Sequence, residues 1–102
     1  MNIDVKIAMQ KKLARLLGYG IFKDSDGDVI VETPDEITIF NPLVNWNQLM
    51  PLVKKYGLVH NYSKPNYQAS VQGLHYHFNV YAVDESLAVA YVECLIKLLS
   101  KK

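Results

Sequence analysis

Hydrophobic residues recur along this chain with two periods, and the change from one period to the other predicts its elements. In the first segment the apolar positions recur every three or four residues, which is the repeat of an amphipathic helix. Its apolar face comprises Val5, Ala8, Met9, Leu13, Leu16 and Leu17. Its expected outer face comprises Lys6, Gln10, Lys11 and Arg15. Asn2 or Asp4 can cap the helix start, and Gly18 favours its end, because glycine adopts the left-handed conformation at little cost.

Three short strands with a period of two are predicted next. Residues 19–23 and 28–32 flank residues 24–27, where an Asp-Gly pair supplies the positive φ angles that a tight hairpin needs. A second turn at residues 33–35 leads into residues 36–40, which alternate polar and apolar side chains. The three strands therefore form a meander.

A second helix is predicted after the turn that follows this meander. Asn45 can cap it, and Gln48 stands three residues further on, as in a capping box. Residues 46–50 are expected to form an initial turn, with Pro51 opening or kinking the helix body and Gly57 ending it. The inward side chains of this helix are Leu49, Leu52 and Val53.

The second half of the chain repeats the pattern. Residues 58–62, 67–71 and 74–82 are predicted strands, and residues 85–100 are a predicted helix capped by Asp84. The apolar stripe of this helix comprises Ala88, Tyr91, Val92, Leu95, Leu98 and Leu99. The order α-βββ-α-βββ-α predicts one α+β domain over residues 1–102, with an antiparallel-rich sheet packed against helices in an α/β/α sandwich-like arrangement.

Composition narrows the class of protein and its partners. The chain has 102 residues, of which 50% are hydrophobic and 21% charged, so it can form one core and is not a disordered chain. Its formal net charge is only +1, whereas nucleic-acid binding proteins usually have a strongly basic surface. Nucleic acid is therefore not an expected partner. A single cysteine, Cys94, favours a reducing compartment. Because no apolar run is long enough for a membrane span and the N-terminus has no secretion core, we expect no membrane partner and a cytoplasmic location.

The candidate metal sites in the sequence are weak. Residues 24–28 resemble the start of a calcium loop, but Val29 and Asp35 stand where that loop needs glycine and glutamate. His75 and His77 share one strand face, with His60 as a third potential ligand for zinc. Ordinary half-exposed strand positions explain these histidines more simply, so we predict no metal and no cofactor.

Catalytic signals are also missing from the sequence. Cys94 lies between apolar helix positions and is expected to be buried and inert. No serine has the context of a nucleophile elbow, and no glycine-rich phosphate loop is present. We therefore predict that the protein is not an enzyme.

Tyrosine is the residue type that most favours a binding function. The chain has seven tyrosines, and the segment 62–67 has one at each end with polar residues between them. Tyrosine is enriched at interface hot spots because it buries a large ring and keeps a polar group. The predicted partner-binding residues are Tyr62, Lys64, Tyr67 and Tyr81.

Residues 40–57 carry a resemblance to a known family. They contain FNPLVNWNQ at 40–48, MPLV at 50–53 and YG at 56–57, which resemble the signature of the phage ABA-sandwich domain family of small phage and prophage proteins. The first helix also ends in a Leu-Gly pair, and the last begins with an acidic, alanine-rich segment, as in that family. The residues expected to form this structural motif are Asn41, Pro42, Asn45, Trp46 and Gly57. Tyr19 departs from the pattern, because a tryptophan often follows the first glycine.

The resemblance implies a sheet with helices on both faces and no established catalytic residues. Together with the absence of catalytic signals, it favours a non-enzymatic phage-type binding protein that occludes a host protein in the host cytoplasm, such as a host defence complex, as anti-CRISPR proteins do. The alternative is a small-molecule or nucleotide-binding module that uses the strand face of His75 and His77. Association between copies of the chain stays open.

Overall fold

The computed structural model describes residues 3–25, 28–71 and 80–100. Its elements are α1 (Ile3–Leu16), β1 (Gly20–Ser25), β2 (Asp28–Glu32), β3 (Ile37–Ile39), α2 (Trp46–Lys55), β4 (Leu58–Ser63), β5 (Asn66–Val71), β6 (Tyr81–Asp84) and α3 (Leu87–Ser100). The α+β class and the order α-βββ-α-βββ-α are confirmed. Most of the last predicted strand, residues 74–79, lies outside the described residues.

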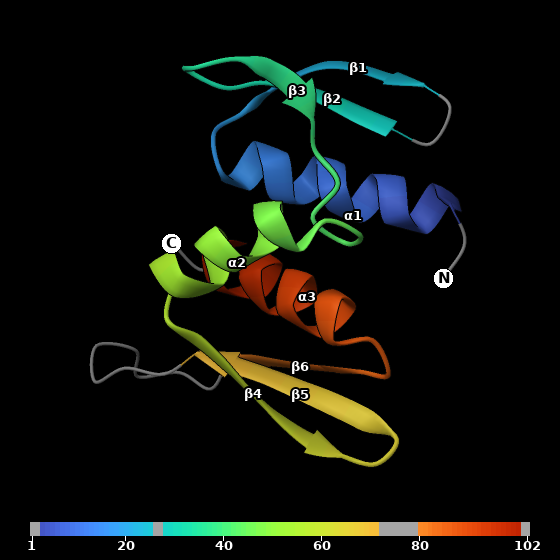
Figure 1. Cartoon of the computed structure of the whole chain (residues 1–102), viewed down its shortest axis with the longest axis vertical. Coiled ribbons are helices and arrows are strands. Elements are labelled where there is room, and N and C mark those ends of the chain that lie inside the picture. Colours follow the sequence, from blue (N-terminus) through green and yellow to red (C-terminus); the bar gives the residue numbers. More distant parts are fainter. Residues whose placement is uncertain (1–2, 26–27, 72–79, 101–102) are drawn as a thin grey trace.

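The strands form two antiparallel sheets, and the helices lie between them (Figure 1). Sheet A has the order β1-β2-β3 and sheet B the order β4-β5-β6. Sheet A packs on α1, α1 packs on α3, and α3 packs on sheet B. This corrects the expectation of one sheet with helices on both faces. In sheet B, the face that carries Ala69 and Ala82 packs on α3, and the opposite face mixes polar Asn61, Gln68 and Ser70 with exposed Val59, Tyr81 and Val83.

Helix α3 is the centre of the core because neighbours cover it on opposite sides. It contacts β5 and β6 on one side and α1 and α2 on the other. All six residues of its predicted stripe are buried, and so are Val89, Ala90 and Cys94. A helix that is apolar all round belongs in the interior, and this one is also the most hydrophobic of the three.

The start of α3 differs from the prediction in its capping residue. Asp84 is the last residue of β6, and its Oδ1 accepts a hydrogen bond from Ser86 N at 2.9 Å. The cap of the helix is Ser86, whose Oγ accepts a hydrogen bond from Val89 N at 3.4 Å. A hydroxyl oxygen bonded to the third helical N–H is the usual geometry of an N-cap serine.

Helix α1 is rotated relative to the face predicted for it. Gln10, expected outside, is 4% exposed, and its Oε1 accepts a hydrogen bond from Leu43 N at 3.3 Å. Val5 and Ala8, expected inside, are exposed. The backbone N–H of Leu43 is buried next to α1 and needs a hydrogen-bond acceptor, and the side chain of Gln10 provides that acceptor inside the core. Gly18 follows the helix with φ +85°, as its helix-ending role requires.

Helix α2 begins as predicted and is then tied to sheet A. The Oδ1 of Asn45 accepts a hydrogen bond from Asn47 N at 3.0 Å, which confirms the N-cap. Gln48 does not complete a capping box. Its Oε1 accepts a hydrogen bond from Asn41 N at 2.7 Å, and its Nε2 donates one to Ile39 O at 2.6 Å. The helix continues through Pro51 to Lys55.

We expect Gln48→Ala to lower the free energy of unfolding by about 1–2 kcal/mol, because it removes two hydrogen bonds between the end of β3 and the first turn of α2. Urea denaturation followed by circular dichroism measures this change. Gln68→Ala, at an exposed position of β5, is the matched control and should change stability by less than about 0.5 kcal/mol. Equal stability of both variants would show that these bonds do not hold α2 in place.

Candidate functional site

Strand register brings Tyr62 and Tyr67 together on one face of sheet B. The two residues are paired across β4 and β5, and their ring centroids are 4.7 Å apart. Tyr67 and the buried Ala69 are two residues apart on β5 and so project from the same face. Both tyrosines therefore lie on the face of sheet B that packs against the helices, next to the turn between β4 and β5.

These two tyrosines are one end of a continuous series of rings. The His60 ring lies 6.2 Å from Tyr67 and 5.6 Å from Tyr91, and Trp46 lies 6.5 Å from Tyr91, all measured between centroids and all edge-to-face. We call this series of five rings, from Trp46 to Tyr62, the aromatic strip. It joins α2, α3 and sheet B, three parts of the chain that lie far apart in sequence.

The aromatic strip is fixed in the middle and exposed at its ends. Tyr91 is 4% exposed, whereas Trp46 is 45% and Tyr62 57% exposed. His60 Nδ1 and the Tyr91 hydroxyl form a hydrogen bond of 2.5 Å. Burial raises the pKa of Tyr91, so the hydroxyl keeps its proton and can donate it to the imidazole. The buried residue thus orients the exposed ones.

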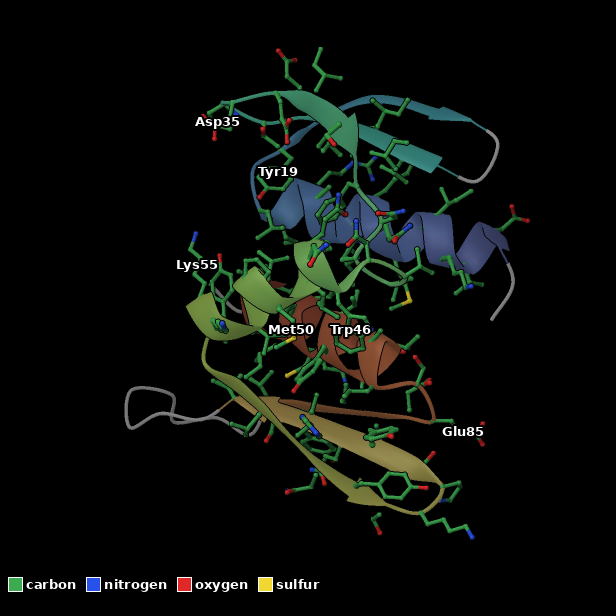
Figure 2. The ribbon with its side chains drawn as sticks, in the orientation of Figure 1. Tyr19, Asp35, Trp46, Met50, Lys55 and Glu85 are labelled. Atoms are coloured by element: carbon green, nitrogen blue, oxygen red, sulfur yellow. The ribbon has the colours of Figure 1, made fainter. Side chains whose placement is uncertain are left out.

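Trp46, the exposed end of the aromatic strip on α2, contacts α3. Its ring meets Tyr91 of α3 edge-to-face, and Figure 2 shows Trp46 and Met50 between α2 and sheet B. Met50, one helical turn further along α2, adds exposed apolar surface beside it, at 36% exposure. Lys54, one turn beyond Met50, and Lys64, in the β4–β5 turn, are exposed cations at the margins. Tryptophan, tyrosine and methionine with a charged rim are the composition of a protein-binding surface.

Tyr81 lies apart from the other predicted partner-binding residues. It pairs with Ser70, one residue away from Ala69, so it projects from the outer face of sheet B. Its carbonyl oxygen accepts a hydrogen bond from Lys97 Nζ at 2.9 Å, and that cation lies 5.7 Å from its ring centroid. Tyr62, Lys64 and Tyr67 gather at one end of sheet B, and Tyr81 belongs to a different surface.

The sequence did not single out His60 and Tyr91 as parts of this site. His60 was considered only as a metal ligand, and Tyr91 only as a core residue. The sequence did contain one indication of the site: His60 and Tyr62 are two residues apart on a strand, so they project from the same face. Nothing in the sequence brings Tyr91 to them, because that contact depends on how α3 packs on sheet B.

The residues of the family-like motif build the connection that presents Trp46. Asn41 O accepts hydrogen bonds from Val44 N and Asn45 N, which closes the turn before α2. Pro42 is fully buried, and Asn45 caps the helix that begins at Trp46. Gly57, with φ +67°, leads from α2 into β4. These residues position two ends of the aromatic strip relative to each other.

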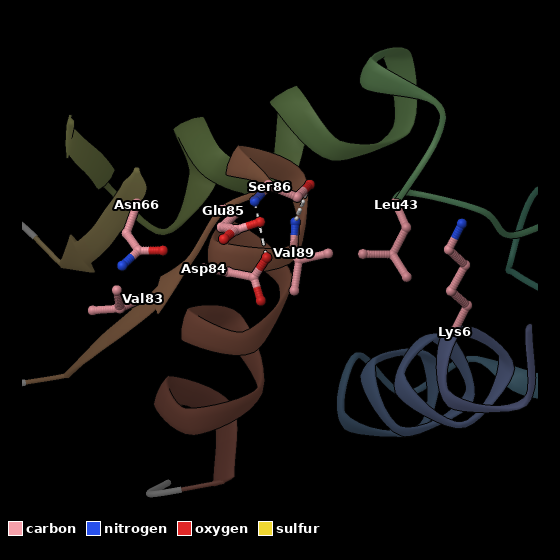
Figure 3. A pocket seen from close by; sticks show the side chains of 8 residues that line it. All are labelled: Lys6, Leu43, Asn66, Val83, Asp84, Glu85, Ser86 and Val89. Atoms are coloured by element: carbon pink, nitrogen blue, oxygen red, sulfur yellow. Dashed lines mark hydrogen bonds between the residues drawn. The ribbon is translucent and has the colours of Figure 1, made fainter. Parts of the chain in front are cut away.

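A second feature is a pocket of about 680 Å³ at the start of α3 (Figure 3). It is lined by Lys6, Leu43, Asn66, Val83, Asp84, Glu85, Ser86 and Val89. Two polar atoms of the lining, Asp84 Oδ1 and Ser86 Oγ, accept hydrogen bonds from backbone N–H groups at the start of α3. The charged side chains of the lining are Lys6, Asp84 and Glu85, and the Ser86 hydroxyl is engaged in the cap of α3.

His75 and His77, the basis of the metal and ligand alternatives, lie outside the described residues. Among residues 3–25, 28–71 and 80–100, no group of three or more His, Cys, Asp or Glu could hold a metal ion. In the same part of the chain, no helix has the length and apolar character needed to cross a membrane.

No family model matches the sequence, and no curated protein matches it either. Membership of the phage ABA-sandwich domain family stays a prediction.

Cys94 provides a test of the core beneath the site. It is fully buried on α3 beside Val80 O, and burial raises the pKa of its thiol to about 11. At pH 8 the folded protein should therefore hold a protonated thiol and react with iodoacetamide far more slowly than after denaturation in guanidinium, because the thiolate is the nucleophile. Mass spectrometry measures the alkylated fraction. Equal rates in both states would mean that α3 is not buried as described.

Proposed function

We propose that this chain is a non-enzymatic binding protein that engages a partner protein through the aromatic strip. The observation that carries the proposal is the contrast within the strip, in which the central Tyr91 is buried and hydrogen-bonded while Trp46 and Tyr62 are about half exposed. Large rings held in place before binding lose little conformational freedom when a partner covers them. Tryptophan and tyrosine are also the residues most enriched at binding hot spots.

The partner class we favour is a protein of a bacterial host cell. Its support is the resemblance of residues 40–57 to small phage proteins. A protein of 11.6 kDa can act by covering a functional surface of a larger one, and a host defence complex in the cytoplasm is the target that a phage protein would gain most by covering. This activity requires affinity and shape, and it requires no catalytic group.

The experiment that tests the proposal is capture from bacterial lysate with four forms of the protein. Wild type and Tyr81→Ala serve as the matched pair, since Tyr81 is exposed but on the other face of sheet B. Trp46→Ala and Tyr62→Ala remove the exposed ends of the aromatic strip. The specific partner is the protein retained by the first two forms and reduced with the last two.

With that partner in hand, titration calorimetry should show that Trp46→Ala and Tyr62→Ala each weaken binding by about 1–3 kcal/mol, as truncation of hot-spot residues does. Tyr81→Ala should bind like wild type. Circular dichroism must show that every variant is folded, because Trp46→Ala also removes the edge contact with Tyr91.

A double variant, His75→Ala with His77→Ala, should also bind like wild type. Loss of binding in this variant, with Trp46→Ala and Tyr62→Ala unaffected, would contradict the proposal. It would favour a ligand site on the histidine face instead.

A further inference from the structure

Helices α1 and α3 line a shallow, open apolar groove of about 690 Å³ that is separate from the aromatic strip. Its apolar lining comprises Val5, Ala8, Met9 and Ile96. Its charged lining comprises Asp4, Lys12, Glu93 and Lys97. Val5 is 44% exposed and Ala8 is exposed, although the sequence pattern predicts both on the inner face of the helix. Helix α1 thus has one apolar face in the core and another that lines an open groove.

The charges along α1 indicate what covers the groove. Asp4, Ala8 and Lys12 follow one another at intervals of four residues, so they form one ridge along the helix. An acid stands at one end of this ridge, a base at the other, and the smallest apolar side chain between them. Such a ridge is complementary to a copy of itself that runs in the opposite direction. Glu93 and Lys97, also four residues apart, line the α3 side of the groove, where Lys97 Nζ donates a hydrogen bond to Tyr81 O.

We propose that a second copy of this chain occupies the groove, in a two-fold dimer whose axis passes near Ala8. The two α1 helices pack antiparallel, because this places Asp4 of each copy opposite Lys12 of the other and lets the backbones approach at Ala8. Val5, Met9 and Ile96 are then covered by the same residues of the partner copy, as the symmetry of an isologous interface requires.

The dimer leaves both aromatic strips accessible. With successive residues separated by roughly 100° around a helix, Glu93, Ile96 and Lys97 lie roughly 140–240° around α3 from Tyr91. The groove and the aromatic strip are therefore on opposite sides of α3. Two outward-facing strips make the dimer bivalent, and a partner with two copies of the target surface would be bound more tightly by the dimer than by one chain.

Sedimentation equilibrium over roughly 1–200 µM tests the dimer directly, at concentrations where weak specific association is visible. The wild-type protein should approach twice the monomer mass of 11.6 kDa. Asp4→Lys and Lys12→Glu should each raise the dissociation constant by about tenfold or more, because each places like charges opposite one another. The double variant that carries both changes should recover wild-type association, since the exchanged charges are again complementary.

Arg15→Glu is the matched control, because it makes the same charge change as Lys12→Glu on the same helix at a residue that does not line the groove. It should associate like wild type. A wild-type protein that stays monomeric at the highest concentration would overturn the proposal. So would a dimer that neither Asp4→Lys nor Lys12→Glu weakens, because its interface would lie elsewhere. Trp46→Ala and Tyr62→Ala should leave the dimer intact, so this test is independent of the proposed binding function.

Discussion

The burial of α3 between α1 and sheet B is the constraint on which the rest of the structure depends. One face of sheet A packs on α1, and one face of sheet B packs on α3. Helix α3 covers sheet B and at the same time supplies the surface on which α1 and α2 pack. Its side chains are therefore apolar almost all round, and its one phenolic hydroxyl has to find a partner inside the protein. That partner is His60, so the packing of the core also organises the exposed surface.

The aromatic strip and the groove lie on two different sides of α3. Towards sheet B and α2, Tyr91 contacts His60 and Trp46, and His60 continues the series to Tyr67. Towards α1, Ile96 and its charged neighbours line a groove with both signs of charge. The proposed binding surface and the proposed dimer interface are thus connected through one buried helix.

The sequence was most informative where the determinants of structure are local. The pairing of β1 with β2 and the cap at Asn45 were predicted correctly, because each depends on neighbours within a few residues. The roles of Gln10 and Gln48 were not predicted, since their hydrogen bonds reach Leu43, Asn41 and Ile39 across the fold. The separation of Tyr81 from Tyr62 was missed for the same kind of reason, because it depends on the register between strands.

The most direct test of the central claim is hydroxyl-radical footprinting of the protein alone and in complex with the partner captured from lysate. The partner should suppress oxidation of Trp46, Met50 and Tyr62, which are exposed on or beside the aromatic strip in the free protein. Oxidation of Tyr81 on the outer face of sheet B should be unchanged. Protection of Tyr81, with Trp46 and Tyr62 oxidised as in the free protein, would contradict the account and place the interface on the other face of the sheet.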